Sequence, residues 1–346
     1  MEFLEPSDVK GPGRSFRAVN RKRIFYWNWC YLRPFLKKVF PVFLHEIVRQ
    51  IRARFQPTLE QYPPIPMKLP TYREFFGFSQ PESLPVVSIV TPSLNQAQFL
   101  ERTIQSVLGQ QYPNLEYVIM DGVSEDGTDR ILLEYTTRVT YLESRQDFGQ
   151  ANAINRGFHR TTGEIMAWLN ADDLLLPGSI AYIAEFFLKH PEVDVIYGYR
   201  ICIDEDDREI GRWILPPHDN AIVPWANYIP QETLFWRRRI WEKIGGYLDE
   251  SYQFVMDWDL LMRFQRVGAT FIRLPHFLGA FRVHSRQKTN RMADIGKLEA
   301  ASLHQKYHGY SVEWLNIRYQ VRQYLLRCAW YYLLYYLGVS RDEVSF

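Results

Sequence analysis

The feature that most constrains the fold is a regular alternation of short apolar runs and helical segments between residues 85 and 200. The runs are short and rich in β-branched and aromatic residues, which is typical of buried strands. Strand–helix alternation of this kind builds a mostly parallel sheet with helices on both faces. Ligands of such sheets bind beyond the carboxyl ends of the strands. The sequence therefore predicts an α/β fold with its site at that edge.

The apolar periodicity gives approximate bounds for these elements. The expected strands cover residues 86–91, 115–120, 139–142, 165–169 and 193–199, and the expected helices cover residues 97–108 and 151–159. Pro177 is expected in the first turn of a further helix, where a missing N–H is tolerated. Two acidic turns follow strands, one beginning at Asp121 and one at Asp172-Asp173, and they mark the candidate site.

Composition divides the chain into four regions. They are a basic, aromatic arm with a proline-rich linker (1–84), the α/β half (85–200), a second half of α+β character (201–310) and a C-terminal aromatic helix (311–346). The net charge is only +2, but Glu46 is the one acidic residue between Lys10 and Arg54. Such a basic arm favours an anionic partner.

Two interpretations of the terminal regions stay open. Basic residues with Trp and Tyr favour docking on an anionic membrane surface, which would suit a lipid-linked acceptor. Alternatively, both regions pack against each other, against the main domain or against a second copy in a homo-oligomer. The arm contains a helical stripe of Phe43, Ile47, Ile51 and Phe55, which fits either interpretation. No nucleic acid is expected, because no recognition module accompanies the basic residues.

The three cysteines bear on location and on metal binding. Cys30, Cys202 and Cys328 lie far apart and form no C-x-x-C pair, so neither a zinc site nor a disulfide framework is expected. A reducing compartment fits this pattern. No signal peptide and no apolar run of membrane-spanning length is recognisable. We therefore expect a cytoplasmic protein, free or peripheral on the inner face of the cell membrane.

The two acidic turns each allow a functional and a structural interpretation. Adjacent carboxylates such as Asp172 and Asp173 repel each other unless a cation is present, and Mg²⁺ or Mn²⁺ prefers such oxygen ligands. Asp is also a favoured helix N-cap, which is the structural alternative. The turn that begins at Asp121 can accept hydrogen bonds from a base or ribose. It can equally be an ordinary turn capped by Asp126 or Thr128.

Read in order, the motifs are more specific than any one of them. The series is VSIVTPSLN (87–95), QSVLGQQYPNLE (105–116), DGVSEDGT (121–128), DFGQ (147–150), NRG (155–157), TGE (162–164) and NADD (170–173). This series resembles the family 2 glycosyltransferases over about residues 85–290. The resemblance implies a GT-A-like, mostly parallel sheet flanked by helices. It also implies inverting transfer of a hexose-type sugar from a nucleotide-sugar donor, such as a UDP-sugar, to a glycan or lipid-linked glycan acceptor.

The resemblance assigns donor-side roles residue by residue. The implied donor-binding residues are Pro92, Ser93, Leu94, Asn95, Asp121, Gly122, Asp147 and Asp172. Asp121 would bond the base and Asp172 the ribose, while Gly122 stands where some relatives carry a second Asp. Asp173 would ligate Mn²⁺ or Mg²⁺ on the diphosphate, and His284 would complete that metal shell. Without the resemblance, a lone His is more often structural, and Arg282 could instead pair with phosphate.

The resemblance also implies an acceptor side. Asp257, at the start of an expected helix, matches the catalytic base that removes the acceptor proton, although Met256 replaces the family's usual first acid. Gln231, Glu232 and Asp259 are further acceptor-side candidates; a helix cap and a simple turn are the structural alternatives. A nucleotidyltransferase or a non-catalytic nucleotide-sugar-binding scaffold are the rival functions. The former usually has a glycine-rich basic loop after its first strand, and the latter would be expected to lose Asp173 or Asp257.

Overall fold

The computed structural model describes residues 59–69, 84–288 and 292–338. All of them belong to one compact unit, residues 53–346. The predicted helical stripe at residues 43–55 and the basic arm lie outside the described residues. Gly338 follows the last described helix with a positive φ of 67°.

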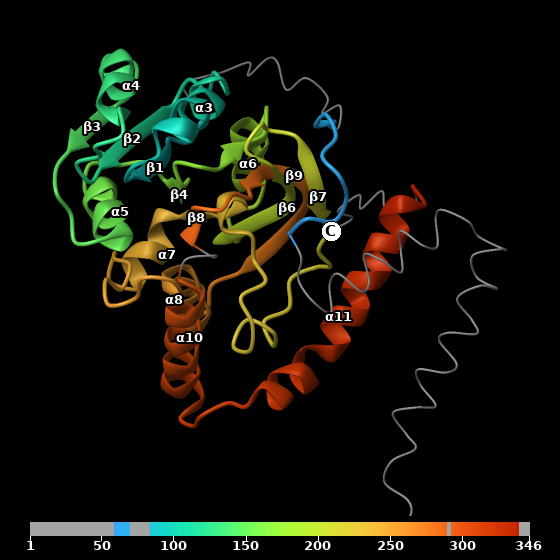
Figure 1. Ribbon diagram of the computed structural model, residues 1–346. Coiled ribbons are helices and arrows are strands. Elements are labelled where there is room, and N and C mark those ends of the chain that lie inside the picture. Colours follow the sequence, from blue (N-terminus) through green and yellow to red (C-terminus); the bar gives the residue numbers. More distant parts are fainter. Residues whose placement is uncertain (1–58, 70–83, 289–291, 339–346) are drawn as a thin grey trace, which may run out of the picture. The chain divides into compact units, whose positions relative to one another are not determined.

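A single nine-stranded sheet forms the centre of this unit (Figure 1). Its strands are β1 (Val87–Ser93), β2 (Leu115–Asp121), β3 (Tyr141–Ser144), β4 (Ile165–Trp168), β5 (Leu174–Leu175), β6 (Val195–Ile203), β7 (Glu209–Trp213), β8 (Phe235–Arg237) and β9 (Phe271–Arg282). The order is β3-β2-β1-β4-β8-β6-β9-β5, with β7 paired to β6. The first four of these run parallel, whereas β8 is antiparallel to both of its neighbours. The predicted α/β class and its mostly parallel strand set are confirmed.

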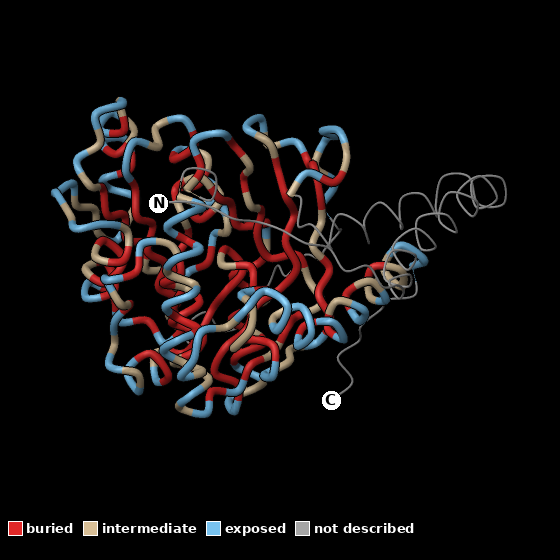
Figure 2. The backbone as a smooth tube through the Cα atoms, turned by 60° about the horizontal axis from the view of Figure 1, so that its bottom comes forward, coloured by how far each residue is buried: buried red, intermediate tan, exposed pale blue. Residues whose placement is uncertain are grey.

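Helices cover both faces of the sheet. They are α3 (Ala97–Leu108), α4 (Thr128–Tyr135), α5 (Gln150–Phe158), α6 (Ser179–Lys189), α7 (Arg238–Lys243), α8 (Met256–Arg266), α10 (Ala293–His308) and α11 (Trp314–Tyr336), with a 3₁₀ turn η2 (Gln231–Thr233). Because strand side chains alternate, Ile89 belongs to the hydrophobic cluster that includes residues of α3, α4 and α6, whereas its neighbour Val90 belongs to the cluster that includes residues of α5, α7, α8 and α11. Figure 2 shows the resulting buried centre with exposed residues around it.

Most of the predicted elements agree with the structure, and one helix start was wrong. The helix at residues 97–108 has the predicted bounds. Pro177, however, precedes its helix, which begins at Ser179 after Gly178. Gly178 has a φ of +80°, a conformation that turns the chain before the helix and suits glycine. The strand β6 crosses the expected boundary at residue 200 and pairs with β9, so both halves share one sheet.

Close packing of α5 on β1 brings that helix to the site. A Cβ atom on Gly157 would lie 2.5 Å from Cγ1 of Val90 and 3.2 Å from Cγ of Met120. The glycine therefore lets the helix lie directly on the strands. The N-terminus of α5, at Gln150, consequently lies near the carboxyl end of β4.

The proline-rich segment at residues 59–69 packs along β7. Ile65 forms an antiparallel bridge with Glu209, and the backbone N–H of Gln61 donates to the Ile210 carbonyl at 2.7 Å. Arg212 donates to the Lys68 carbonyl and to the Tyr335 hydroxyl of α11. This corner ties the segment, β7 and the last helix together. Among the described residues, no helix is both long and apolar enough to cross a membrane.

Candidate functional site

A cavity of about 1020 Å³ lies at the carboxyl ends of β1 and β4. It is lined from both halves of the chain. The lining includes the predicted residues Pro92, Ser93, Leu94, Asp147, Asp172, Asp173, Gln231 and Asp257. The cavity therefore brings the implied donor side and the implied base Asp257 into one space.

Asp121 shapes the turn after β2. Its carboxylate accepts the backbone N–H groups of Val123 and Ser124, both at 3.1 Å, and the Ser144 hydroxyl at 2.6 Å. Ser124 also donates its hydroxyl at 2.5 Å. The side chain is 4% exposed and does not line the cavity. These contacts give Asp121 a structural role in the turn, and its base-binding role stays a prediction.

Hydrogen bonds tie the loop after β1 to the turn after β2. Asn95, with a φ of +54°, accepts the Glu125 N–H at 2.9 Å and so joins the loop after β1 to the turn after β2. A Cβ atom on Gly122 would lie 2.9 Å from Oδ2 of Asp147. A second Asp at position 122, as in some relatives, would therefore crowd the Asp147 carboxylate. Asp126 binds the N–H of Thr128 and that of Ala97, while Gly127 occupies the cap position of α4.

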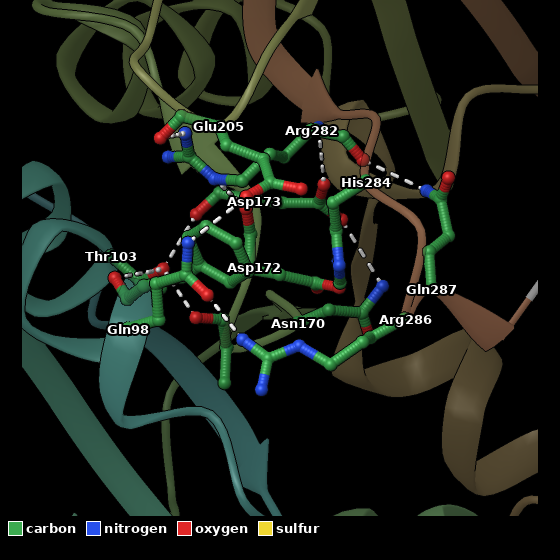
Figure 3. A network of polar contacts seen from close by, with 12 residues as sticks. Gln98, Thr103, Asn170, Asp172, Asp173, Glu205, Arg282, His284, Arg286 and Gln287 are labelled. Atoms are coloured by element: carbon green, nitrogen blue, oxygen red, sulfur yellow. Dashed lines mark hydrogen bonds and ion pairs between the residues drawn. The ribbon is translucent and has the colours of Figure 1, made fainter.

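Asp172 and His284 meet at the centre of the site, although 112 residues separate them. Nε2 of His284 lies 3.0 Å from Oδ2 of Asp172, and the His284 side chain is almost fully buried. The ring also packs against Phe99, with a centroid separation of 4.7 Å. Figure 3 shows the His284 ring directed at the Asp172 carboxylate from the end of β9. The Asp172 carboxylate itself lines the cavity.

The carboxylate of Asp173 has different hydrogen-bond partners from that of Asp172. It accepts the Arg282 backbone N–H at 3.0 Å and the Asn170 amide at 3.2 Å. The side chain is 1% exposed, and burial, followed by the charges of Asp172 and Glu232, raises its pKa well above the usual range. The helix-cap alternative fails for this pair, because β5 follows and the next helix begins only at Ser179.

Arg282, the last residue of β9, contacts the NADD turn but does not line the cavity. Its Nε donates to the Asp172 carbonyl at 2.8 Å, and its guanidinium also contacts the Asp204 carbonyl and the Asp207 carboxylate. The side chain is fully buried. It therefore positions the NADD turn from behind, and the expectation that it pairs with phosphate gains no support from these contacts.

A chain of side-chain amides connects the two sides of the cavity. Lys288 donates to Gln150 at 2.8 Å, and Gln150 donates to Asn170 at 2.7 Å. Asn170 in turn donates to Gln231 at 3.0 Å as well as to Asp173. One network therefore orients residues from α5, the NADD turn and η2.

Asp257 lies in the first turn of α8 and lines the cavity. It accepts the Asn227 amide at 2.9 Å and the Trp258 backbone N–H at 2.8 Å. Burial raises the pKa of this carboxyl, while those two hydrogen bonds and the charge of Lys288 oppose the shift. A carboxylate with a raised pKa is a stronger proton acceptor, as a general base requires.

The other acceptor-side candidates differ in exposure to the cavity. Gln231 lines it and donates to the Trp168 carbonyl at 2.9 Å. Glu232 is buried behind the wall in a two-point ion pair with Arg200. Asp259 is fully buried in ion pairs with Arg263 at 2.7 Å and Lys306 at 2.9 Å, away from the cavity. The structure thus places Glu232 and Asp259 in ion pairs, and only Gln231 reaches the site.

Several lining residues were not identified from the sequence. Arg200, Asn227, Arg286 and Lys288 all line the cavity. Figure 3 shows Arg286 reaching from the segment after β9 to Gln98 of α3. Burial lowers the pKa of the Lys288 ammonium. The two cationic residues that closely follow His284, Arg286 and Lys288, could have been identified from the sequence. Arg200 could not, because it lies within an otherwise apolar strand.

The residues present fit a divalent cation that is shared with a ligand. Asp172 and His284 bring a carboxylate oxygen and an imidazole nitrogen within 3.0 Å of each other beside the cavity. No cluster of three or more His, Cys, Asp and Glu that could hold a metal was found in the described part of the chain. Mg²⁺ and Mn²⁺ are commonly held by few protein ligands, with phosphates and water completing the shell. A phosphate-bearing ligand would therefore be needed to complete the site.

Relatives of this chain found by sequence comparison are named glycosyltransferases. An uncharacterized glycosyltransferase of Rickettsia typhi is 30% identical over 215 residues, which is 60% of this chain and 66% of that protein. TuaG of Bacillus subtilis, named a putative teichuronic acid biosynthesis glycosyltransferase, is 33% identical over 147 residues, or 40% of this chain and 57% of TuaG. The matched region thus spans less than two thirds of each relative's length.

Two solved structures share the fold. TarS of Staphylococcus aureus in complex with UDP-GlcNAc aligns with a TM-score of 0.54 at 15% identity, over 75% of this chain and 77% of TarS. The mannosyltransferase PcManGT of Pyrobaculum calidifontis, in complex with GDP-Man and Mn²⁺, aligns with a TM-score of 0.50 at 19% identity, over 86% and 80%. The expected GT-A-like fold is confirmed. The family model of glycosyl transferase family 2 matches residues 88–288, which include the NADD turn, Asp257 and His284, and the chain belongs to this family.

Proposed function

We propose that this protein transfers a hexose-type sugar from a nucleoside-diphosphate sugar to an acceptor hydroxyl, with inversion at the anomeric carbon. One observation carries the proposal: Asp172, which pairs with the buried His284, and Asp257, whose pKa is raised by burial, line the same cavity. A site that binds a diphosphate at one end and holds a base at the other can perform a single displacement. One displacement inverts the reacting carbon.

The donor would lie over the loops after β1, β2 and β3. Pro92, Ser93, Leu94 and Asp147 line the cavity there and would surround the nucleoside. UDP is the first donor to test, because TarS binds UDP-GlcNAc on the same fold. A GDP-sugar is the second, because PcManGT binds GDP-Man.

A divalent metal, Mn²⁺ or Mg²⁺, is part of the proposal, and such an ion supplies positive charge to the departing diphosphate. Of the two adjacent carboxylates, the contacts favour Asp172, with His284, as its ligand. Asp173, assigned this role from the sequence, has both carboxylate oxygens engaged by Asn170 and Arg282. Asp173 would then hold the turn in the geometry that presents Asp172.

On the acceptor side, Asp257 would accept the proton of the attacking hydroxyl. Asn227 and the Trp258 N–H hold its two oxygens in place, and burial keeps its pKa raised. Gln231 would orient the acceptor, which its position on the cavity wall supports. A glycan or lipid-linked glycan in surface polysaccharide assembly is the proposed acceptor class, supported by the name of TuaG. Such a role would place the enzyme in the cytoplasm.

The first experiment is donor hydrolysis with UDP-, GDP- and dTDP-sugars, in Mn²⁺ or in EDTA. Metal-dependent release of one nucleoside diphosphate is expected from the wild-type protein. Asp172→Asn should lower that release by about 10²-fold or more, because it removes a charge from the reacting centre. Asp129→Asn, an exposed residue of α4, is the matched control and should release the nucleotide at the wild-type rate.

Binding measurements complete this test. If the wild-type protein binds none of these donors with or without metal, the transferase proposal is refuted in favour of a non-catalytic role. If Asp173→Asn abolishes metal-dependent release while Asp172→Asn does not, the metal belongs to Asp173 as the sequence suggested. A folding check by thermal unfolding separates either loss from misfolding.

A further inference from the structure

The helix α11 has two opposite apolar faces, of which only one is packed. Val321, Tyr324, Cys328 and Tyr332 are buried against the domain core. The second face, here called the outward stripe, consists of Leu315, Tyr319, Arg322, Leu326 and Trp330. Figure 2 shows exposed residues recurring along this helix near the C-terminus.

Helix geometry shows that the two faces are opposed. Members of the outward stripe recur every three or four residues, which keeps them on one side. Each buried residue stands two positions after a stripe member, about 200° further around the helix. The packed face therefore holds the helix in place while the stripe points away from the domain.

The exposure of the stripe is large for apolar side chains. Leu315 is 69% exposed, Leu326 65%, Tyr319 62% and Trp330 57%. Trp314 and Tyr310, at the corner between α10 and α11, are also exposed. Soluble proteins seldom leave contiguous apolar surface of this kind without a partner.

The charges on α11 indicate what that partner is. The helix carries Arg318, Arg322 and Arg327 and contains no Asp or Glu. Arg327 pairs with Asp219, but Arg318 and Arg322 have no acidic partner among the described residues. Arg322 instead lies over the Tyr319 ring at 3.5 Å, in the middle of the stripe.

We propose that the outward stripe of α11 docks on an anionic lipid surface, with the helix parallel to the membrane plane. Trp and Tyr prefer the water–lipid boundary, and arginine reaches lipid phosphates from the same depth. At about 1.5 Å per residue, α11 is about 35 Å long, but its arginines and modest apolarity exclude a membrane span. A second copy of this chain is a poorer fit, because a helix-to-helix contact would bury Arg322 without an acidic partner.

The test uses the full chain and vesicle flotation. Vesicles of phosphatidylcholine alone are compared with vesicles that also contain phosphatidylglycerol, at low and at high salt. The wild-type protein should float with the anionic vesicles and dissociate at high salt. Leu326→Glu should weaken this binding by about tenfold or more, since it replaces an inserted apolar side chain by a charge.

Matched variants separate the stripe from general surface effects. Leu133→Glu makes the same change on α4, where the leucine is 78% exposed, and should bind as the wild type does. Arg322→Gln should bind anionic vesicles about fivefold more weakly and leave binding to phosphatidylcholine unchanged. Leu315→Glu repeats the test on the same stripe if Leu326→Glu lowers the unfolding temperature.

Three results would overturn the proposal. The first is a wild-type protein that does not float with anionic vesicles. The second is equal binding by Leu326→Glu and Leu133→Glu, which would assign any membrane affinity to another part of the chain. The third is a dimer, seen by light scattering, that Leu326→Glu dissociates, which would make the stripe a contact between two copies. The outcome is independent of the proposed sugar transfer, because it measures binding alone.

Discussion

The ion pair between Glu232 and Arg200 allows a structural role to be separated from an acceptor-binding role. Nε of Arg200 donates to Oε1 of Glu232 at 2.7 Å, and Nη2 donates to Oε2. The Arg200 guanidinium is enclosed by the rings of Trp213 and Phe281, with separations of 4.7 and 4.4 Å. Glu232 is 2% exposed and Arg200 7%. Glu232→Gln would therefore leave a buried cation without its counter-charge.

The expected cost follows from that burial. Breaking a buried ion pair by neutralising one partner costs about 3–5 kcal/mol. The compact unit is large, so about 2 °C of unfolding temperature per kcal/mol applies, and the midpoint should fall by roughly 6–10 °C. The control is Glu185→Gln, which breaks an exposed pair with Lys189 and should cost about 0.3–0.5 kcal/mol.

Thermal unfolding and acceptor kinetics together distinguish a structural role of Glu232 from an acceptor-binding role. If Glu232 is structural, the midpoint falls as stated, and the KM for the acceptor, measured below the transition, stays near the wild-type value. An unchanged midpoint together with a raised acceptor KM would refute this reasoning and return Glu232 to the acceptor side. The double variant Arg200→Met, Glu232→Leu should recover most of the lost stability, since no buried charge remains.

Three further predictions concern the base and the close packing beneath the site. Asp257→Asn should lower the rate of sugar transfer to the acceptor by about 10²–10⁴-fold, while the equilibrium affinity for the donor stays unchanged. A weakened affinity for the donor would contradict a base role. Lys288→Gln should raise the pKa of Asp257 further, because the lysine charge opposes the shift caused by burial. Since the base works deprotonated, the acidic limb of the kcat/KM profile should move to higher pH, and a shift to lower pH would be contrary to this account. Gly157→Ala should destabilise the protein by about 1–3 kcal/mol in urea unfolding, because its Cβ would meet Val90 at 2.5 Å; a neutral result would mean that α5 can shift away from β1.

The first half of the fold was predictable because its signals are local. The strand and helix periods between residues 87 and 168 each arise within one segment, and helix α3 has the bounds that its apolar spacing gives. The helix after Pro177 was misplaced because proline is compatible with several positions near a helix start. The left-handed Gly178 decides which of them is used.

The residue types alone predicted the candidate site only as a set, and individual roles came from the resemblance to the family. Asp257 and Asp259 are two positions apart, and that resemblance ranked Asp257 first. On a helix they point about 200° apart, so that Asp257 lines the cavity and Asp259 pairs with Arg263 and Lys306. Which of them faces the cavity depends on how α8 packs on the sheet.

By itself, the sequence determined the α/β class, the family motifs and the two ends of the site, because periodicity and short motifs are properties of neighbouring residues. The tertiary structure decided which charges face the cavity and which are paired. Asp172 contacts His284, which lies 112 residues further along the chain, and Glu232 forms an ion pair with Arg200 of β6. Such pairings depend on the register and packing of distant elements, and burial in the same packing raises the pKa of Asp173 and Asp257.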